Sequence, residues 1–427
     1  MEKLVVADNQ LPIYYYENEA LHRFCITLYI KAGILYESRD EIGITHVFEH
    51  MIFRNINRVL DGQMKQKLDK MGAYFNGCTF KEFVEIKIIA ANKHFSECAD
   101  IISKIFEPID ILAKEYCAEI KRIKAEIREE DEKKTIDYMG QKTVWKDTSL
   151  SKSIAGKKSV ISGLSLMRIR EYAEEICTAN NMFMYVTGAV TEKDINELAN
   201  KVGKYKLREN NIIKDNKAPI PYGFMNRSDK IKIKKADYCA IRFALDFDMS
   251  MCKKAELDLL YDILFDGECS KIHEELSEKT GFVYSYSSSL EQYNNIGNFY
   301  LSYEIDEKNV VKSIKRVIKV FNSLKNGIEE ELTYVKPTYV DNGDMDLDEP
   351  EKLNWIMAYE SHILEQNYKT IEDRKKAYIS VTNQDIKILA NKLFKPQNLV
   401  ISIKYNKTSN KKKIEEQEIK EIVKSLA

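Results

Sequence analysis

The sequence is organised around residues 43–53, which read Gly-Ile-Thr-His-Val-Phe-Glu-His-Met-Ile-Phe. Two of the six histidines of the chain, His46 and His50, fall in this stretch with Glu49 between them. On a helix, residues four apart share one face, so both imidazoles can reach a single metal ion. The stretch therefore predicts a helix that carries two metal ligands.

Glu49 follows His46 by three residues and lies on the same helical face. A carboxylate beside a zinc-bound water can take its proton and later return it to a leaving amine. The H-x-x-E-H order is the inverted form of the zinc-protease motif. The alternative interpretation is an amphipathic helix that carries two histidines without a metal.

A catalytic zinc ion usually has three protein ligands and one open position. The best source of the third ligand is residues 119–131, where isoleucines recur at helical spacing without Gly or Pro. Glu119 and Glu126 are seven residues apart, so they face the same way. For the acidic residues 129–131 we favour a solvated helix face instead.

Together these segments resemble the pitrilysin/insulinase family of zinc peptidases. In that family the third ligand is a Glu about 76 residues after the second His, with another Glu seven residues before it. Glu126 follows His50 by 76 residues, and Glu119 stands seven before it. The resemblance implies one zinc ion per chain, bound by His46, His50 and Glu126. It makes Glu49 the general base and Glu119 a carboxylate that orients a ligand histidine.

Residues 72–79, Gly-Ala-Tyr-Phe-Asn-Gly-Cys-Thr, resemble the family's Gly-x-x-x-Asn-Ala-x-Thr segment. In the family this segment leads into an edge strand with which an extended peptide pairs. The resemblance therefore makes Asn76 a substrate contact, whereas the alternative is a turn residue. The family's Gly-Thr after the zinc helix is replaced by Arg54-Asn55-Ile56, which we interpret as a loop difference.

Composition predicts a water-soluble globular protein of 427 residues with ample core, at 44% hydrophobic and 31% charged residues. A formal net charge of −1 gives no bias toward nucleic acid. The eight scattered cysteines are typical of a reduced protein. No secretory signal is evident at the N-terminus and no apolar run could span a membrane, so we expect a cytoplasmic location.

Two pairs of strand-like segments indicate a diverged duplication. Residues 25–30 match 239–244, and residues 181–186 match 398–403, at offsets of 214 and 217. We therefore predict an α+β fold of two homologous domains, each an antiparallel sheet with helices packed on one side.

The polar, proline-containing residues 207–228 suit a linker. The predicted domains are then the zinc-binding domain 1–206 and a second, non-catalytic domain 229–427 that contributes to the substrate cleft. Residues 255–264 in the second half contain no histidine, which agrees with one zinc ion per chain.

Residues 267–289 resemble a block of the family's second domain, in which an Arg and a Tyr seven residues later reach the substrate. Tyr284 keeps the Tyr position, where its hydroxyl could stabilise an oxyanion, but Ser277 stands at the Arg position. Tyr284 could alternatively be a packing residue of a strand. In some short bacterial members of the family, a sister chain without zinc supplies both groups. We therefore expect a heterodimer with such a homologous subunit, the alternative being a homodimer or a self-sufficient chain.

The sequence thus predicts a zinc endopeptidase of the short two-domain bacterial type related to processing peptidases. Its substrates are expected to be peptides or unfolded segments, such as a ribosomally made peptide. The main alternative is a non-catalytic scaffold subunit of the same fold, although such proteins usually lose the metal ligands. The third candidate is a zinc-dependent hydrolase that is not a peptidase.

Overall fold

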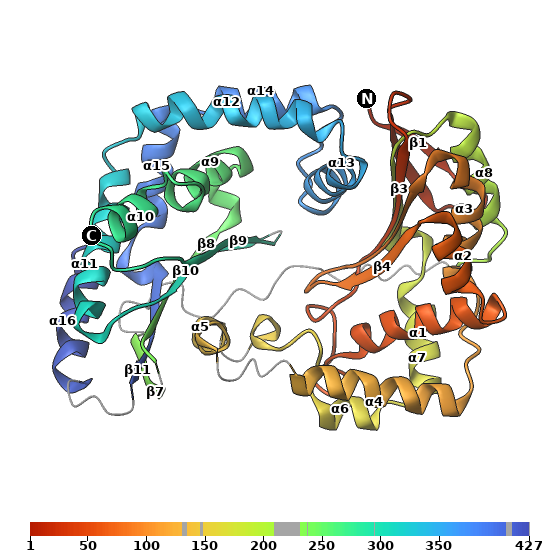
Figure 1. The fold of residues 1–427 in the computed structure, drawn as a ribbon, viewed down its shortest axis with the longest axis horizontal. Helices are drawn as coiled ribbons and strands as arrows, with labels where there is room; N and C mark the ends of the chain where they lie inside the picture. Colours follow the sequence, from red (N-terminus) through yellow and green to blue (C-terminus); the bar gives the residue numbers. More distant parts are fainter. Residues whose placement is uncertain are drawn as a thin grey trace. The chain divides into compact units, whose positions relative to one another are not determined.

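The computed structural model describes residues 1–129, 135–145, 148–208, 231–236, 238–293, 295–406 and 412–426. Within these residues the chain forms two compact units. Unit 1 consists of Met1–Glu130, Lys152–Asn216 and Gly343–Ile371, and unit 2 consists of Asp131–Ser151, Lys217–Asn342 and Glu372–Ala427. Figure 1 labels the elements of both units. None of the described helices is long and apolar enough to cross a membrane.

Unit 1 is built on a six-stranded sheet in the order β1-β2-β6-β3-β5-β4. The strands are β1 (Lys3–Val6), β2 (Pro12–Glu17), β3 (Arg23–Ile30), β4 (Tyr74–Thr79), β5 (Val84–Ala91) and β6 (Met182–Gly188). The helices of its first two segments are α1 (Ile44–Val59), α2 (Met64–Met71), α3 (Phe95–Ser103), α4 (Ala113–Glu129), α6 (Lys158–Gly163), α7 (Leu166–Ile176) and α8 (Glu192–Gly203). Because α1 packs on the core face of this sheet, the two predicted metal ligands lie beside the edge strand β4.

Unit 2 repeats this plan with a five-stranded sheet in the order β7-β11-β8-β10-β9. The strands are β7 (Ile231–Ala236), β8 (Ala240–Asp248), β9 (Ser287–Gln292), β10 (Ile296–Glu304) and β11 (Leu399–Asn406). The helices are α5 (Ile136–Val144), α9 (Lys254–Phe265), α10 (Lys271–His273), α11 (Val310–Leu324), α12 (Glu329–Asp346), α14 (Ile371–Ser380), α15 (Asn383–Leu393) and α16 (Lys412–Lys424). The boundary between the units falls near the end of α12.

The predicted duplication is confirmed by strand pairing. In unit 1, β3 pairs antiparallel with β6, and in unit 2, β8 pairs antiparallel with β11, so the matched segments are neighbours in both sheets. The α+β fold is also confirmed. Each sheet contains one parallel pair, β2 with β6 and β7 with β11, so neither is purely antiparallel. Parallel strands cannot be joined by a tight turn, and in both units the chain between the two paired strands contains other strands of the sheet as well as helices.

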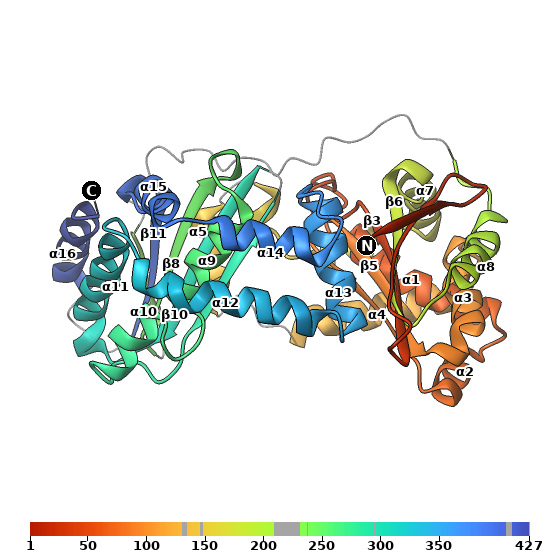
Figure 2. The ribbon, with the colours of Figure 1, turned by 90° about the horizontal axis from the view of Figure 1, so that it is seen from above.

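The second face of each sheet is covered by a segment from the other half of the chain. In unit 1, α13 (Pro350–Trp355) and the π-helix η9 (Ile356–Ile363) pack on the face opposite α1, as Figure 2 shows for α13. Asn354 holds α13 there by donating to the backbone oxygens of Cys25 and Tyr185. In addition, Thr187 donates to the backbone oxygen of Pro350 at 2.6 Å.

In unit 2 the corresponding face carries α5, which contacts β8 and β11. The buried guanidinium of Arg242 pairs with Asp137 of α5, and a Cβ at Gly140 would collide with the Arg242 side chain. The indole of Trp145 donates to the carboxylate of Asp246 at 3.3 Å. The exchanged segments are equivalent, since α5 lies between α4 and α6 and α13 lies between α12 and α14.

The two units therefore differ from the expected continuous domains 1–206 and 229–427 by this reciprocal exchange. The expected linker, residues 207–228, lies almost entirely outside the described residues. Its role as a linker stays a prediction.

Candidate metal centre

Helix α1 starts at a sharply turned glycine. Gly43 has a φ of +99°, and a Cβ there would approach the Cα of Gly156 to 2.7 Å. The half-buried carboxylate of Glu37 accepts hydrogen bonds from the backbone N–H groups of Gly43 at 2.7 Å and Thr45 at 3.1 Å. An acceptor at this position satisfies N–H groups that a helix leaves unpaired at its start. This cap fixes the helix one turn before the first histidine.

The residues of α1 divide between the core and the metal-binding face. Val47, Phe48 and Met51 are buried in the core of unit 1. His46 and His50 are one turn apart, with ring centroids 4.7 Å apart and ring planes nearly perpendicular. The predicted pairing of the two imidazoles on one helical face is confirmed.

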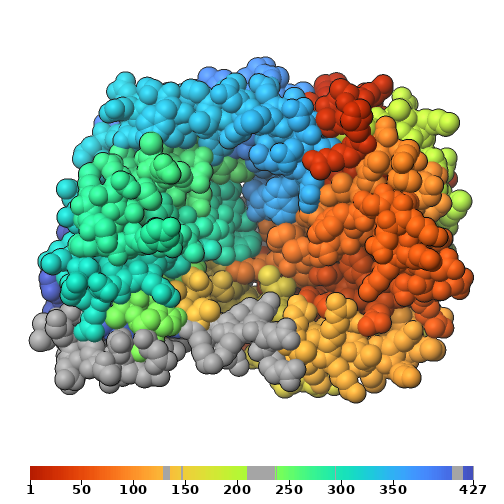
Figure 3. All heavy atoms as spheres, in the orientation of Figure 1, coloured from red at the N-terminus to blue at the C-terminus, as the bar shows by residue number. Residues whose placement is uncertain are grey.

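Helix α4 brings the acidic residues to this face. Ile120 and Ile123 are buried in the core of unit 1, which fixes the rotation of the helix. Glu119 and Glu126 then point toward α1, as their contacts with its histidines show. Figure 3 shows α4, in gold, at the surface of unit 1, in keeping with the partial exposure of Glu126.

The structure brings the three predicted metal ligands together. Glu126 Oε1 lies 3.5 Å from His46 Nε2, and Glu126 Oε2 lies 3.5 Å from His50 Nε2. All three donor atoms lie within 4.8 Å of one another, the one such group of three found in the described part of the chain. Two imidazole nitrogens and one carboxylate are a donor set that fits zinc and leaves a fourth position open.

Glu119 is buried behind His50. Its Oε1 lies 2.8 Å from His50 Nδ1, and its Oε2 accepts a hydrogen bond from Arg54 Nε. Burial alone would raise the pKa of Glu119, but the hydrogen bonds from His50 and Arg54 outweigh it and lower the pKa to about 2. An ionised Glu119 holds the proton of His50 on Nδ1, which leaves the Nε2 lone pair for a metal.

His46 is supported differently from His50. Burial and the neighbouring His50 lower the pKa of His46 to about 4, although Glu49 acts in the opposite direction. The ring is therefore neutral at pH 7, the form that binds a metal. Its Nδ1 is buried, and no protein group in the described residues hydrogen-bonds to it.

Glu49 has a partner that the sequence analysis did not foresee. Its Oε2 accepts a hydrogen bond from the Thr79 hydroxyl of strand β4 at 2.5 Å. Asn76 lies on the same strand, three residues earlier, and donates to the Tyr74 hydroxyl at 2.9 Å. Because side chains alternate along a strand, Asn76 points to the other face of β4. Asn76 is thus part of an edge strand, as expected, and its contact with substrate stays a prediction.

The departure at Arg54-Asn55-Ile56 is not a loop difference. All three residues lie inside α1, which runs to Val59. Asn55 is buried and ties α1 to the following chain, donating to the backbone oxygens of Glu107 and Pro108 and accepting from the N–H of Asp110. Arg54 binds Glu119, so the altered tripeptide supports the centre.

Tyr284 and Ser277 belong to unit 2. Tyr284 is 97% exposed, in the segment between the π-helix η7 (Glu274–Glu278) and β9. It is therefore not a packing residue. Ser277 is part of η7, and its backbone oxygen accepts from the N–H of Gly281. The roles of both in binding substrate stay predictions.

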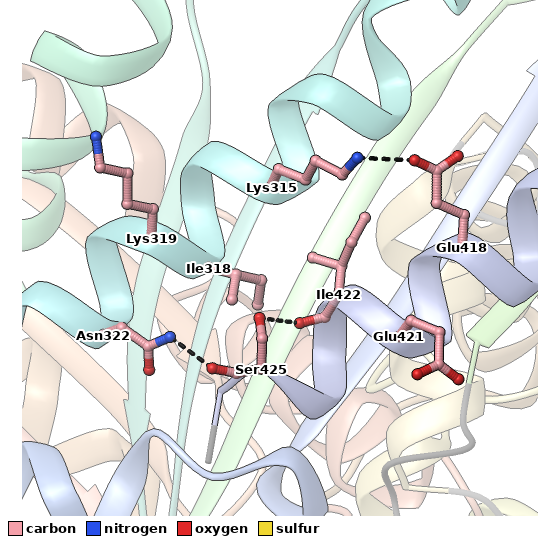
Figure 4. Close-up of a pocket in the computed structure, with 8 residues that line it drawn as sticks. All are labelled: Lys315, Ile318, Lys319, Asn322, Glu418, Glu421, Ile422 and Ser425. Atoms are coloured by element: carbon pink, nitrogen blue, oxygen red, sulfur yellow. Dashed lines mark hydrogen bonds and ion pairs between the residues drawn. The ribbon is translucent and has the colours of Figure 1, made fainter.

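A groove of about 540 Å³ between α11 and α16 is a second candidate site (Figure 4). Its polar groups pair across it, with Lys315 Nζ 2.8 Å from Glu418 Oε1 and Asn322 Nδ2 donating to the backbone oxygen of Ser425. Ile318 and Ile422 form part of its lining. Since Lys315 and Asn322 of α11 bond directly to α16, this groove is the seam of two packed helices, and the metal centre remains the better candidate.

Two family models match the chain in succession. The model for insulinase (peptidase family M16) matches residues 14–158, and the model for the M16 inactive domain matches residues 163–336. The first match contains the three candidate metal ligands, and the second begins in unit 1 and extends into unit 2.

Curated relatives agree with these matches. An uncharacterized zinc protease of Rickettsia felis is 25% identical over 408 residues, which cover 90% of this chain and 93% of that protein. The mitochondrial-processing peptidase subunit beta of Neurospora crassa is 24% identical over 179 residues, 41% of this chain and 37% of that protein.

Solved structures share the fold. A peptidase M16 inactive domain from Pseudomonas fluorescens superposes with a TM-score of 0.81 at 17% identity, covering 96% of this chain and 99% of that one. A protease from Helicobacter pylori gives a TM-score of 0.79 at 16% identity, covering 95% and 99%. These structures show the shared fold, and the two matched family models show that the chain belongs to the insulinase family of peptidases, family M16.

Proposed function

We propose that this protein is a zinc-dependent endopeptidase that cleaves peptides or unfolded segments. The convergence of His46, His50 and Glu126 around one point, with Glu49 on the same helix turn, carries the proposal. The zinc protease name of the Rickettsia relative supports it. The chemistry that a bound zinc ion supplies is polarisation of the scissile carbonyl and a lower pKa for a bound water.

The side chains of unit 1 would divide the remaining work. Glu49 takes a proton from the attacking water and returns it to the leaving amine. Glu119 keeps His50 in the tautomer that can bind metal, and Arg54 holds Glu119 in turn. An extended peptide would pair with the free edge of β4, which favours substrates that are not folded.

We further propose that the working enzyme is a heterodimer with a homologous subunit that lacks the zinc motif. The observation behind this is Ser277, which offers no positive charge where the family's second domain has an Arg. The exposed Tyr284 is available to a substrate or partner. A ribosomally made peptide is the substrate that we propose for such a pair. The relative from Neurospora crassa is itself named as a subunit.

The test of catalysis is the Glu49→Gln variant. Loss of the general base is expected to lower peptide turnover by about 10²- to 10⁴-fold while one zinc ion per chain is retained. Glu97→Gln, at an exposed position in α3, is the matched control and should behave as the wild type. Mass spectrometry of a peptide mixture measures cleavage, and metal analysis measures zinc.

A non-catalytic scaffold subunit is the alternative, and it would give the opposite result. Zinc-loaded wild-type protein would then cleave no peptide, and Glu49→Gln would leave its assembly unchanged.

For the heterodimer, the test is isolation of Glu49→Gln from its native cells. A sister chain in equal amount supports the pair, whereas robust turnover by one purified chain overturns it.

A further inference from the structure

The edge strand β4 presents two different faces. Phe75, Gly77 and Thr79 share the face toward α1, because they pair in register with Ile88, Ile86 and Val84 of the core. Tyr74, Asn76 and Cys78 alternate with them on the other face, where they are exposed. The first set is therefore the one that reaches the metal-binding helix.

Along that face, β4 follows the surface of α1 closely. The Phe75 and Phe53 rings pack in a tilted arrangement, with centroids 5.0 Å apart and ring planes at 59°. A Cβ at Gly77 would lie 2.7 Å from the Phe53 ring and 3.1 Å from Glu49 Cγ. Any larger residue at position 77 would push the strand, the Phe53 ring or Glu49 aside. The absence of a side chain at Gly77 thus allows the strand to approach Glu49.

Thr79 makes a hydrogen bond that depends on this close packing of β4 against α1. Its hydroxyl, on a side chain that is 9% exposed, donates to Glu49 Oε2 at 2.5 Å. A hydrogen bond from a hydroxyl to a carboxylate at this distance is among the stronger kinds in proteins. It restrains Glu49 through Oε2. The other oxygen, Oε1, stays available to a second donor, because both oxygens of a carboxylate can accept hydrogen bonds.

We propose that Thr79 is a positioning residue for Glu49. Its hydroxyl fixes the carboxylate so that Oε1 faces the position of the attacking water. This inference rests on the proposed peptidase function, in which Glu49 is the general base. A displacement of about 1 Å in a catalytic group can lower a rate about 100-fold, so a single well-placed hydrogen bond is sufficient to matter.

Thr79 could instead be only a buried hydroxyl that needs an acceptor. That role would affect stability and would be shared by other buried threonines. Thr187 of β6 is the matched example, because its hydroxyl is fully buried and donates to the backbone oxygen of Pro350 without touching α1. Comparing Val at the two positions separates positioning of Glu49 from general stability.

The experiment measures kcat and KM for one peptide with zinc-loaded wild type, Thr79→Val, Thr79→Ser and Thr187→Val. We expect Thr79→Val to lower kcat by about 10- to 100-fold with KM nearly unchanged. Thr79→Ser keeps the hydroxyl and should restore most of kcat. Thr187→Val should lose stability and keep kcat. If Thr79→Val does not fold, Thr79→Ala replaces it, because Ala removes the hydroxyl without adding a branched side chain.

Crystal structures of Thr79→Ser and the Val or Ala variant supply a readout that does not depend on turnover. We expect Glu49 to keep its conformation in the Ser variant and to leave it in the other. Equal kcat for wild type and Thr79→Val, or an unmoved Glu49, overturns the positioning role. If the wild type itself cleaves no peptide, the proposed function fails, while the conformation of Glu49 still decides whether Thr79 holds it.

Discussion

Helix α1 of unit 1 and helix α9 of unit 2 occupy the same place in two similar folds, yet their polar faces differ. Each helix follows the strand at the centre of its sheet, β3 or β8. On α1, His46 and His50 meet Glu126 at distances that suit a metal. On α9, Lys254 Nζ lies 2.5 Å from Asp258 Oδ2, with each residue 8% exposed, and Tyr378 also donates to that oxygen.

The contacts that the edge strands of the two sheets make with these helices can be compared in the same way. The last residue of β4, Thr79, donates to Glu49 on α1, and the last residue of β9, Gln292, donates to Asp258 Oδ1 on α9 at 3.2 Å. The frame is therefore retained in both units. The two units differ in whether the carboxylate on the helix has an oxygen that is available to a group from outside the protein. Asp258 is surrounded by protein donors, so it serves stability, whereas Glu49 has a single described hydrogen bond.

The largest expected effect comes from breaking the metal centre of α1. His46→Ala removes one of the three proposed ligands, so we expect zinc content to fall well below one per chain and peptide turnover to be lost. His273→Ala, in unit 2, is the control and should retain both. Metal analysis and a peptide assay check this result. A fully active His46→Ala protein would mean that the centre is elsewhere.

A smaller effect, and one of a different kind, is expected from breaking the α9 cluster. Asp258→Ala leaves the Lys254 ammonium buried without its carboxylate, which should lower the free energy of unfolding by about 3–5 kcal/mol. Zinc content and kcat of the folded protein should be unchanged. Asp266→Ala, at an exposed position, should change stability by less than about 0.5 kcal/mol. Denaturant unfolding measures both, and a stable Asp258→Ala would refute the structural role of this cluster.

The smallest effect is a difference in pH dependence between the two units. Burial raises the pKa of Asp262 on α9 from 3.8 to about 7. Its folded-state pKa is raised, so its contribution to stability is lost as pH rises from about 4 to about 7. The pKa of Glu119 is instead lowered to about 2, so its contribution is complete above about pH 4.5 and is lost at lower pH.

Asp262→Asn should therefore gain stability relative to the wild type between pH 5 and pH 8. Metal-free Glu119→Gln should show no such gain in this range. Denaturant unfolding at the two pH values measures the difference. Parallel pH profiles for wild type and Asp262→Asn would contradict the raised pKa.

Much of the candidate metal centre could be predicted, because some of its residues are close together in the sequence and the others follow at the spacing that the family resemblance gives. His46, Glu49 and His50 lie on two turns of one helix, and the resemblance supplied Glu126 and Glu119 by their distance along the chain. The contact of Thr79 with Glu49 could not be predicted in this way. It depends on how closely β4 lies against α1, and the small size of Gly77 is a signal only once the packing is known.

The exchange of α5 and α13 was also not predicted, although the sequence contains a signal for it. After Arg23, strand β3 is apolar or uncharged on both faces, with Phe24 and Ile26 toward α1 and Tyr29 toward α13. A strand that is buried on both sides requires a second covering layer. The local helix patterns of residues 136–144 and 350–355 do not reveal which sheet they cover, because amphipathic periodicity identifies a buried face without naming its partner.

The reciprocal exchange also bears on how a chain of this kind could arise. Two copies of a half-length subunit that trade equivalent segments form a swapped dimer with two-fold symmetry. Joining two such genes end to end would give one polypeptide in which both exchanges are already present. In this chain they are the helix α13 in unit 1 and the helix α5 in unit 2. An ancestor of that form would have depended on dimerisation to cover its sheets, whereas the fused chain supplies both covering segments itself.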